Sequence, residues 1–182
     1  MTDYQRSEMK ANATKGYIDE LRKESDRGSI IVIVSLLDDV LSKLIKAKLA
    51  PSIENRDELF DDYSAPFSTF SSRIDLAYRL GLIRPQVRAT FHLLRKIRNN
   101  FAHITGASNF HDASTKSRIH EIYKLNSDAI DSMKSLVINP SGAVTEKSNE
   151  IDHRLIIELF FASTVAYLMD AINDIDPIKP LF

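Results

Sequence analysis

The chain has 182 residues, 43% of them hydrophobic and 27% charged, which is ordinary for one soluble globular domain with a real core. Lysine and arginine number 24 and aspartate and glutamate 25, so no overall positive charge draws the chain to nucleic acid or to a membrane surface. The absence of cysteine excludes disulfides, thiolate metal sites and a redox role for cysteine.

The two ends of the chain differ in hydrophobicity. Residues 1–15 are polar, of mixed charge, and lack the apolar segment of a secretory signal. The longest apolar run, residues 155–169, contains Glu158 and is shorter than the roughly 20 residues that a bilayer span needs. We therefore expect a cytoplasmic protein with no membrane segment, in which a polar segment 1–15 precedes one all-helical domain over 16–182.

The first half of the chain shows apolar residues at helical spacing. A short helix is expected over 16–22. A longer one, apolar almost all round near its start, is expected over 29–50 and is stopped by Pro51. Residues 52–66 have the composition of a loop, with one helical turn at 57–60.

The next two helices have recognisable boundaries. Ser68 or Thr69 can cap a helix that ends near Gly81. Pro85 suits the first position of the following helix, which reaches about His103.

The last third of the chain contains weaker helical patterns followed by one strongly apolar helix. Residues 114–135 predict one or two helices, 136–138 could pair as a short strand, and 139–142 form a turn signal. A final helix is expected over 149–173. The sequence thus predicts an all-α bundle of about five to seven mostly antiparallel helices, without a cofactor.

The helix that follows Pro85 carries polar residues in unexpected positions. Val87, Phe91 and Leu94 mark its buried stripe, and continuing their spacing puts Arg98 at the next inward position. A buried guanidinium must be paired or must line a cleft, because an unpaired buried charge is costly. The basic neighbour Arg95 is expected to face the core in part.

Arg98, Asn99 and His103 together resemble the Arg-x4-His motif of the HEPN superfamily, whose members are small helical bundles. The resemblance implies a metal-independent ribonuclease with a composite site formed across a dimer. Arg98 would neutralise a phosphate, His103 would act as general acid or base on the ribose 2′-hydroxyl, and Asn99 would orient either. The alternative is structural: Arg98 pairs with an interior carboxylate, Asn99 caps a helix end and His103 bonds a backbone carbonyl.

Other charged residues interrupt the apolar helices and predict an internal polar network. Ser25 or Asp26 is a candidate helix cap, and Asp26 or Glu24 a candidate partner for a buried arginine. The adjacent carboxylates of Asp38 and Asp39 could bind a cation, but no histidine or third acid stands at ligand spacing along the same helix. Ion pairs are therefore expected there, and no metal site. The network candidates are Glu24, Asp26, Arg27, Asp38, Asp39, Arg73, Asp75 and Arg95, with Arg73 or Arg98 as the partner of whichever of Asp38 and Asp39 faces inward.

Four segments taken together resemble the mannitol operon repressor family of bacterial cytoplasmic proteins. They are residues 24–28 (ESDRG), 36–41 (LLDDVL), 70–83 (FSSRIDLAYRLGLI) and 94–103 (LRKIRNNFAH), in that order. The resemblance covers about residues 18–105 and implies an all-α protein connected with negative regulation of mannitol-uptake transcription.

These observations favour a repressor-like regulator that acts through a protein partner or through RNA. Direct DNA reading is not favoured, because the chain shows no separate helix-turn-helix domain and has a balanced charge. Ile31, Val32 and the pair Phe160 and Phe161 suggest more apolar surface than one bundle hides, so a homodimer is expected. The alternative function is the ribonuclease.

Overall fold

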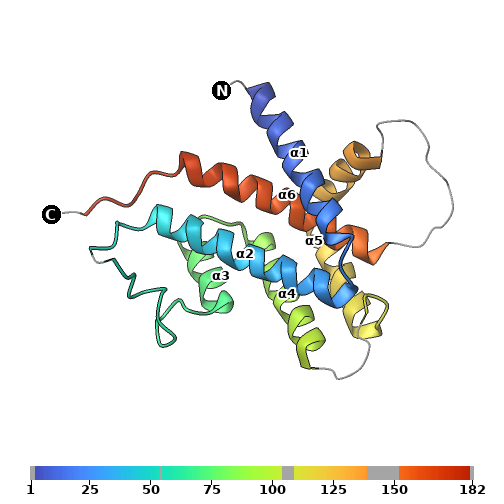
Figure 1. The fold of residues 1–182 in the computed structure, drawn as a ribbon, viewed down its shortest axis with the longest axis horizontal. Coiled ribbons are helices and arrows are strands. Elements are labelled where there is room, and N and C mark those ends of the chain that lie inside the picture. The colour runs from blue at the N-terminus through green and yellow to red at the C-terminus, as the bar shows by residue number, and fades with distance from the viewer. Residues whose placement is uncertain (1–2, 54, 104–108, 139–151, 181–182) are drawn as a thin grey trace.

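The computed structural model describes residues 3–53, 55–103, 109–138 and 152–180, and these residues contain six α-helices (Figure 1). In chain order the helices are α1 (Asp3–Leu21), α2 (Asp26–Lys48), α3 (Phe70–Arg79), α4 (Pro85–His103), α5 (Ala113–Ile138) and α6 (His153–Asp174). The described residues contain no strand, and the predicted all-α bundle is confirmed.

The helix α2 joins the two halves of the bundle, because it packs against α3 and α4 on one side and against α6. Ser25 caps its first turn by accepting a hydrogen bond from the backbone N–H of Gly28, at 3.1 Å. Two of its partners connect the remaining helices: α4 also packs against α3 and α5, and α6 also packs against α1 and α5.

The helices α2 and α6 run side by side in the same direction (Figure 1). Their first turns are joined by an ion pair of Arg154 with Asp26. At the other end, the backbone N–H of Ile178, which follows α6, donates to the carbonyl of Lys48, the last residue of α2. The expected antiparallel arrangement does not hold for this pair, because the connection between the two helices passes through three others.

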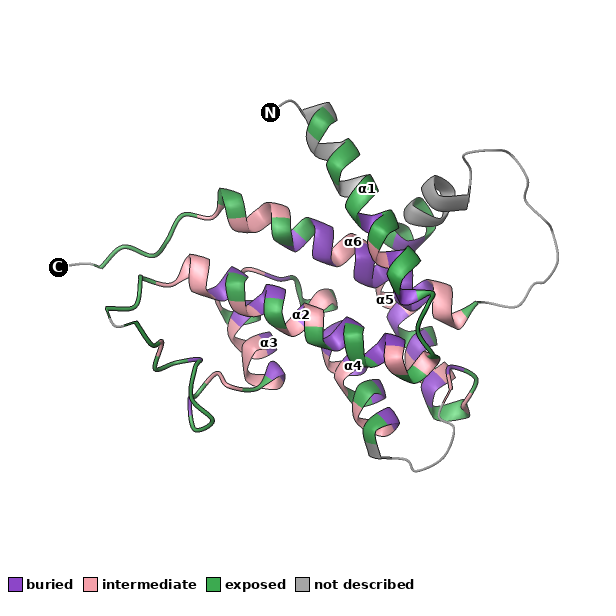
Figure 2. Cartoon of the chain, in the orientation of Figure 1, coloured by how far each residue is buried: buried purple, intermediate pink, exposed green. Residues whose placement is uncertain are grey.

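The core helix is α6, which is buried along most of its length (Figure 2). Phe160 packs edge-on against Phe91 with ring centres 6.4 Å apart, and Phe161 against Tyr17 at 5.7 Å. The expectation that Phe160 and Phe161 add exposed dimer surface was therefore wrong, since both are buried. Among the described helices, only α6 is long and apolar enough to cross a membrane. Length and composition do not distinguish a membrane span from a buried core helix, and 56% of the most apolar 18-residue stretch of α6 is buried inside the protein.

Two local expectations differ from the structure. The helix expected from Gly16 begins at Asp3, and residues 136–138 are the end of α5 and form no strand. The one or two helices expected over 114–135 correspond to α5, whose two helical stretches meet at a kink at Asn126. The amide group of Asn126 donates to the carbonyl of Ile122 and to the hydroxyl of Thr90, each at 2.8 Å. The turn expected at 139–142 lies outside the described residues.

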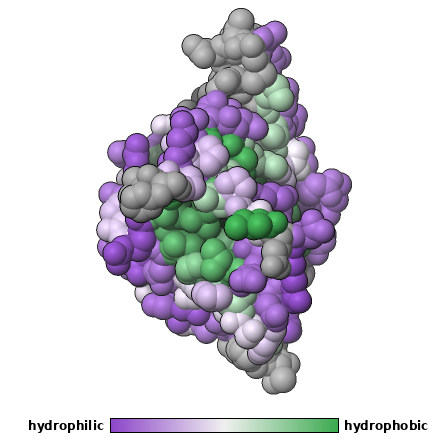
Figure 3. Space-filling model, turned by 90° about the vertical axis from the view of Figure 1, so that its left-hand side faces the viewer, coloured by the Kyte–Doolittle hydropathy of each residue, from purple (hydrophilic) through white to green (hydrophobic). Residues whose placement is uncertain are grey.

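One end of the molecule carries an apolar patch (Figure 3). This end is formed by the C-terminal segment, the last turns of α2 and the loop that follows α2 (Figure 1). Large exposed apolar side chains in these parts of the chain are Ile53, Leu59, Tyr63 and Ile178.

Candidate functional site

A cleft of about 460 Å³ lies between α2, the start of α3 and the second half of α4. We call it the arginine-lined cleft. Its lining residues are Ile31, Val34, Ser35 and Asp38 from α2, Ser68, Thr69, Phe70 and Ser71 around the start of α3, and Arg95, Arg98 and Asn99 from α4.

Arg98 lies at this cleft and not in the core, so the prediction that it takes an inward position was wrong. The inward positions of this part of α4 are Ile97 and Phe101, both fully buried. Burying the isoleucine instead of its neighbour keeps the guanidinium in contact with water, which avoids a large desolvation cost. The Arg98 guanidinium donates a hydrogen bond to the side-chain oxygen of Asn99, at 3.1 Å.

Arg95 supplies the second guanidinium of the cleft. Its side chain is half-buried, and its Nε atom is buried without a hydrogen-bond partner. Within the described part of the chain, neither Arg95 nor Arg98 forms an ion pair with a carboxylate. A buried donor without an acceptor costs about 1–3 kcal/mol.

The carboxylate in the cleft wall belongs to Asp38, and it is already paired. Asp38 accepts a hydrogen bond from Arg73 at 2.8 Å, and the Arg73 side chain is only 15% exposed. The Nε of Arg73 also donates to the carbonyl of Phe67 at 2.8 Å. An ion pair of Asp38 or Asp39 with Arg73 or Arg98 was expected, and the pair of Asp38 with Arg73 confirms it. Among the described residues, Arg95 and Arg98 keep no carboxylate partner at the cleft.

The start of α3 forms the third wall. Thr69 caps this helix by accepting a hydrogen bond from the backbone N–H of Ser72, at 3.2 Å. Phe70 and Ser71 occupy the first two helical positions, where backbone N–H groups have no intrahelical acceptor. The positive end of the α3 dipole therefore adds to the charge of the two arginines.

His103 is the last residue of α4, and its side chain lies outside the described part of the structure. Of the candidate catalytic residues, the structure thus brings Arg98 and Asn99 together at the cleft. The position of the His103 imidazole stays a prediction.

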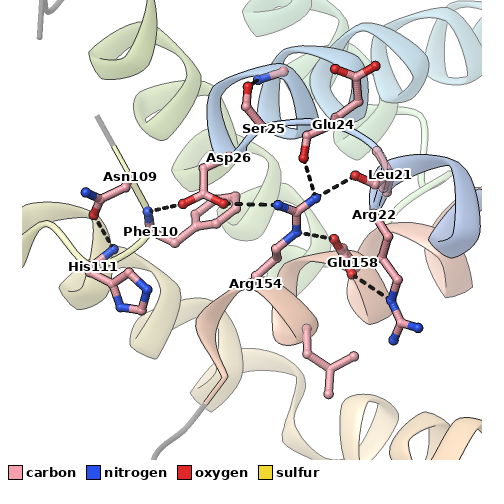
Figure 4. Close-up of polar contacts among 12 residues, drawn as sticks. Leu21, Arg22, Glu24, Ser25, Asp26, Asn109, Phe110, His111, Arg154 and Glu158 are labelled. Carbon is pink, nitrogen blue, oxygen red and sulfur yellow. Dashed lines mark hydrogen bonds and ion pairs between the residues drawn. The ribbon is translucent and has the colours of Figure 1, made fainter. Parts of the chain in front are cut away.

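A second polar cluster lies at the start of α6 and is centred on Arg154 (Figure 4). The Arg154 guanidinium donates to the carboxylates of Glu158 at 2.7 Å and Asp26 at 3.1 Å. It also donates to the backbone carbonyls of Leu21 at 2.5 Å and Glu24 at 2.9 Å, just before α2. Asp26 pairs with an arginine as predicted, but Arg154 is half-buried and not fully buried, and Glu24 contributes only its backbone carbonyl.

Sequence reasoning missed Arg154. The available signal was Glu158, a carboxylate in the most apolar run, with an arginine one helical turn before it. Glu158 is only 2% exposed. Burial raises the pKa of its carboxyl above the ordinary value, although Arg154 and Arg22 both act to lower it.

The Arg154 cluster also fixes the segment before α5, because the second oxygen of Asp26 accepts a hydrogen bond from the backbone N–H of Phe110, at 3.0 Å (Figure 4). Arg27, next to it in the sequence, is exposed and makes a long hydrogen bond of 3.5 Å to the carbonyl of Ala102 at the end of α4. This cluster holds four segments together and is best described as structural.

The remaining network candidates lie apart from both clusters. Asp39 is exposed and pairs with Lys43 at 2.7 Å, so the expectation that it joins an internal network was wrong. Asp75 pairs with Arg88 at 2.6 Å and His92 at 3.2 Å. Partial burial of Asp75 opposes its ionisation, but the hydrogen bonds from Arg88 and His92 outweigh burial and lower the pKa of the carboxyl.

The described residues contain no group of three or more histidine, aspartate or glutamate side chains placed to hold a metal ion. Comparison of the chain with protein-family models, curated proteins and solved structures found no match. The arginine-lined cleft and the Arg154 cluster are therefore interpreted from their own chemistry.

Proposed function

We propose that this chain is a repressor-like regulatory protein that acts by binding a protein or RNA partner through the surface around the arginine-lined cleft. The observation that carries the proposal is the pair Arg95 and Arg98, which share one cleft and have no carboxylate partner among the described residues. Beside them on α2, Ile31 and Val32 are 41% and 36% exposed. Arginine next to exposed apolar side chains is a common composition of binding hot spots.

The regulatory role comes from the resemblance to the mannitol operon repressor family, and with it come a cytoplasmic location and a link to mannitol genes. Sequence-specific DNA reading is not part of the proposal, because the net charge of the chain is −1. A homodimer is part of it. Sedimentation velocity is expected to show association with rising protein concentration, and a monomer at every concentration would contradict the dimer.

A site-specific photo-crosslinking experiment tests the proposal. A photoreactive amino acid would replace Val32 beside the cleft, and as a matched control Tyr167, which is 64% exposed on α6. In cells of the source organism, the position 32 variant is expected to form a discrete adduct that is sensitive to protease or to ribonuclease. Equal labelling at both positions, or an adduct removed only by deoxyribonuclease, would contradict the proposal.

The second candidate function is a metal-independent ribonuclease. It is favoured by the adjacent position of Arg98 and Asn99 in the cleft, on the helix that ends at His103. The test is incubation with end-labelled RNA in EDTA, with Arg98→Ala, His103→Ala and the control Lys96→Ala, whose side chain is exposed. Cleavage that both site variants lose and the control keeps, leaving cyclic-phosphate ends, would establish this function. Absence of cleavage across a broad RNA pool would remove it.

A further inference from the structure

We infer that the arginine-lined cleft is a binding site for the phosphate group of a small molecule, either free phosphate or a phosphate monoester. This inference concerns a ligand of the protein itself. It does not depend on the partner proposed above.

The charge of the cleft matches this ligand. Arg95 and Arg98 stand three residues apart on α4, which places them next to each other on one helix face, and both line the cleft. A phosphate monoester carries about −1.5 to −2 charges at neutral pH, so two guanidinium groups balance it. Guanidinium also matches phosphate oxygens with two parallel hydrogen bonds. The one carboxylate in the wall, Asp38, does not compete for these arginines because it pairs with Arg73.

Donors for the phosphate oxygens come from two directions. From α4 come the guanidinium groups of Arg98, which is exposed, and of Arg95, which is half-buried, and both residues line the cleft. The backbone N–H groups of Phe70 and Ser71 open the α3 helix at the same cleft, and a helix N-terminus favours a phosphate group. The guanidiniums and the helix start thus approach one volume from different elements.

The size and walls of the cleft favour a small molecule over a chain. Its volume of about 460 Å³ lies within the roughly 300–1,000 Å³ usual for small-molecule sites. Ile31 and Val34 give it an apolar side that suits the organic part of an ester, while Ser35 and Asn99 offer hydrogen bonds to hydroxyl groups. The cleft is lined by three elements, α2, α3 and α4, which suits recognition of one phosphate group from several sides.

Isothermal titration calorimetry on the full chain tests the inference, with inorganic phosphate and phenyl phosphate as the two probes. The site variants are Arg98→Gln, which replaces an exposed side chain, and Arg95→Gln. The control is Lys96→Gln, which removes one positive charge from an exposed side chain of the same helix outside the cleft lining. Thermal melts followed by circular dichroism establish that each variant is folded.

The expected result is saturable binding to the natural protein, weakened about ten-fold to a hundred-fold in Arg98→Gln and Arg95→Gln, with little change in Lys96→Gln. Tighter binding of phenyl phosphate would identify an ester as the ligand class, and equal binding of the two probes would identify free phosphate. Three results would overturn the inference. They are no saturable binding of either probe, the same weakening in the Lys96 control as in Arg98→Gln, and Arg98-dependent binding of RNA or a phosphopeptide without binding of the small probes.

Discussion

Replacing Arg154 by methionine removes one guanidinium from the cluster at the start of α6 and keeps most of the side-chain stem. The change leaves Glu158, which is 2% exposed, without its hydrogen-bonded partner at 2.7 Å. Breaking a buried ion pair from one side costs about 3–5 kcal/mol when the other charge is left unpaired. Here the Arg22 Nε atom stays 3.9 Å from the second oxygen of Glu158 as a weaker partner, so we expect a loss near the lower end, about 3 kcal/mol. The carbonyls of Leu21 and Glu24 lose a donor as well. Against a total stability of about 5–15 kcal/mol, we expect a severely destabilised protein.

Urea unfolding at neutral pH, followed by circular dichroism, measures this loss as a change in the free energy of unfolding. The matched control is Lys43→Met, which breaks the pair with Asp39 where the two side chains are 59% and 55% exposed. An exposed pair of this kind contributes less than about 1 kcal/mol. The control therefore separates the effect of burial from the effect of removing a positive charge.

The double variant Arg154→Met, Glu158→Leu isolates the cause. Because it removes the buried charge together with its partner, it is expected to be more stable than Arg154→Met alone. Two results would show that burial does not determine this loss: a free energy of unfolding of Arg154→Met within about 1 kcal/mol of that of the natural protein, or a double variant no more stable than the single one.

Three smaller predictions follow from other contacts. Ser25→Ala removes the cap on the N–H of Gly28 and should lower the free energy of unfolding by about 1 kcal/mol, whereas a change below the error of a urea titration would show that the cap is dispensable. Asp38→Asn leaves the largely buried Arg73 without its charged partner and should cost about 1–3 kcal/mol in the same assay, and an unchanged midpoint would contradict it. For Glu158, burial raises the folded pKa above the ordinary 4.5, so its contribution to stability falls as pH rises from about 4.5 through the raised folded pKa. Urea titrations across that range should therefore show the free energy of unfolding of Glu158→Gln rising relative to that of the natural protein as pH increases. Below pH 4.5 the difference between the two proteins should be constant. The same pH dependence in both proteins would argue against a raised pKa.

The helices were largely predictable because the spacing of their apolar residues agrees with the capping and proline residues at their ends. Pro85 begins α4 as expected, Thr69 caps α3, and the capped start of α2 lies within a few residues of the prediction. The early part of α1 was not predictable in this way, since a polar helix that buries little surface has no periodic signal. The kink in α5 was also hidden, because it depends on the contact of Asn126 with Thr90 of another helix.

The candidate site was predicted in part. The sequence pointed to Arg98 and Asn99, and both line the cleft, but it placed Arg98 in the core. Spacing alone does not decide between Ile97 and Arg98 for the inward position of one turn, whereas the desolvation cost of a guanidinium does. The opposite wall of the cleft could not be predicted from the sequence, because it comes from α2 and from the start of α3. Only the tertiary packing of these elements brings them next to α4.

The most direct test of the central claim, that the arginine-lined cleft is the functional site, is a titration followed by nitrogen–proton correlation spectra of the arginine Nε–H groups. Phenyl phosphate would be added to the full chain, with Arg154 as the internal reference because its Nε is already bonded to Glu158. The signals of Arg95 and Arg98 are expected to shift together and saturate while the Arg154 signal stays in place. A saturating shift at other arginines, with Arg95 and Arg98 unmoved, would contradict it.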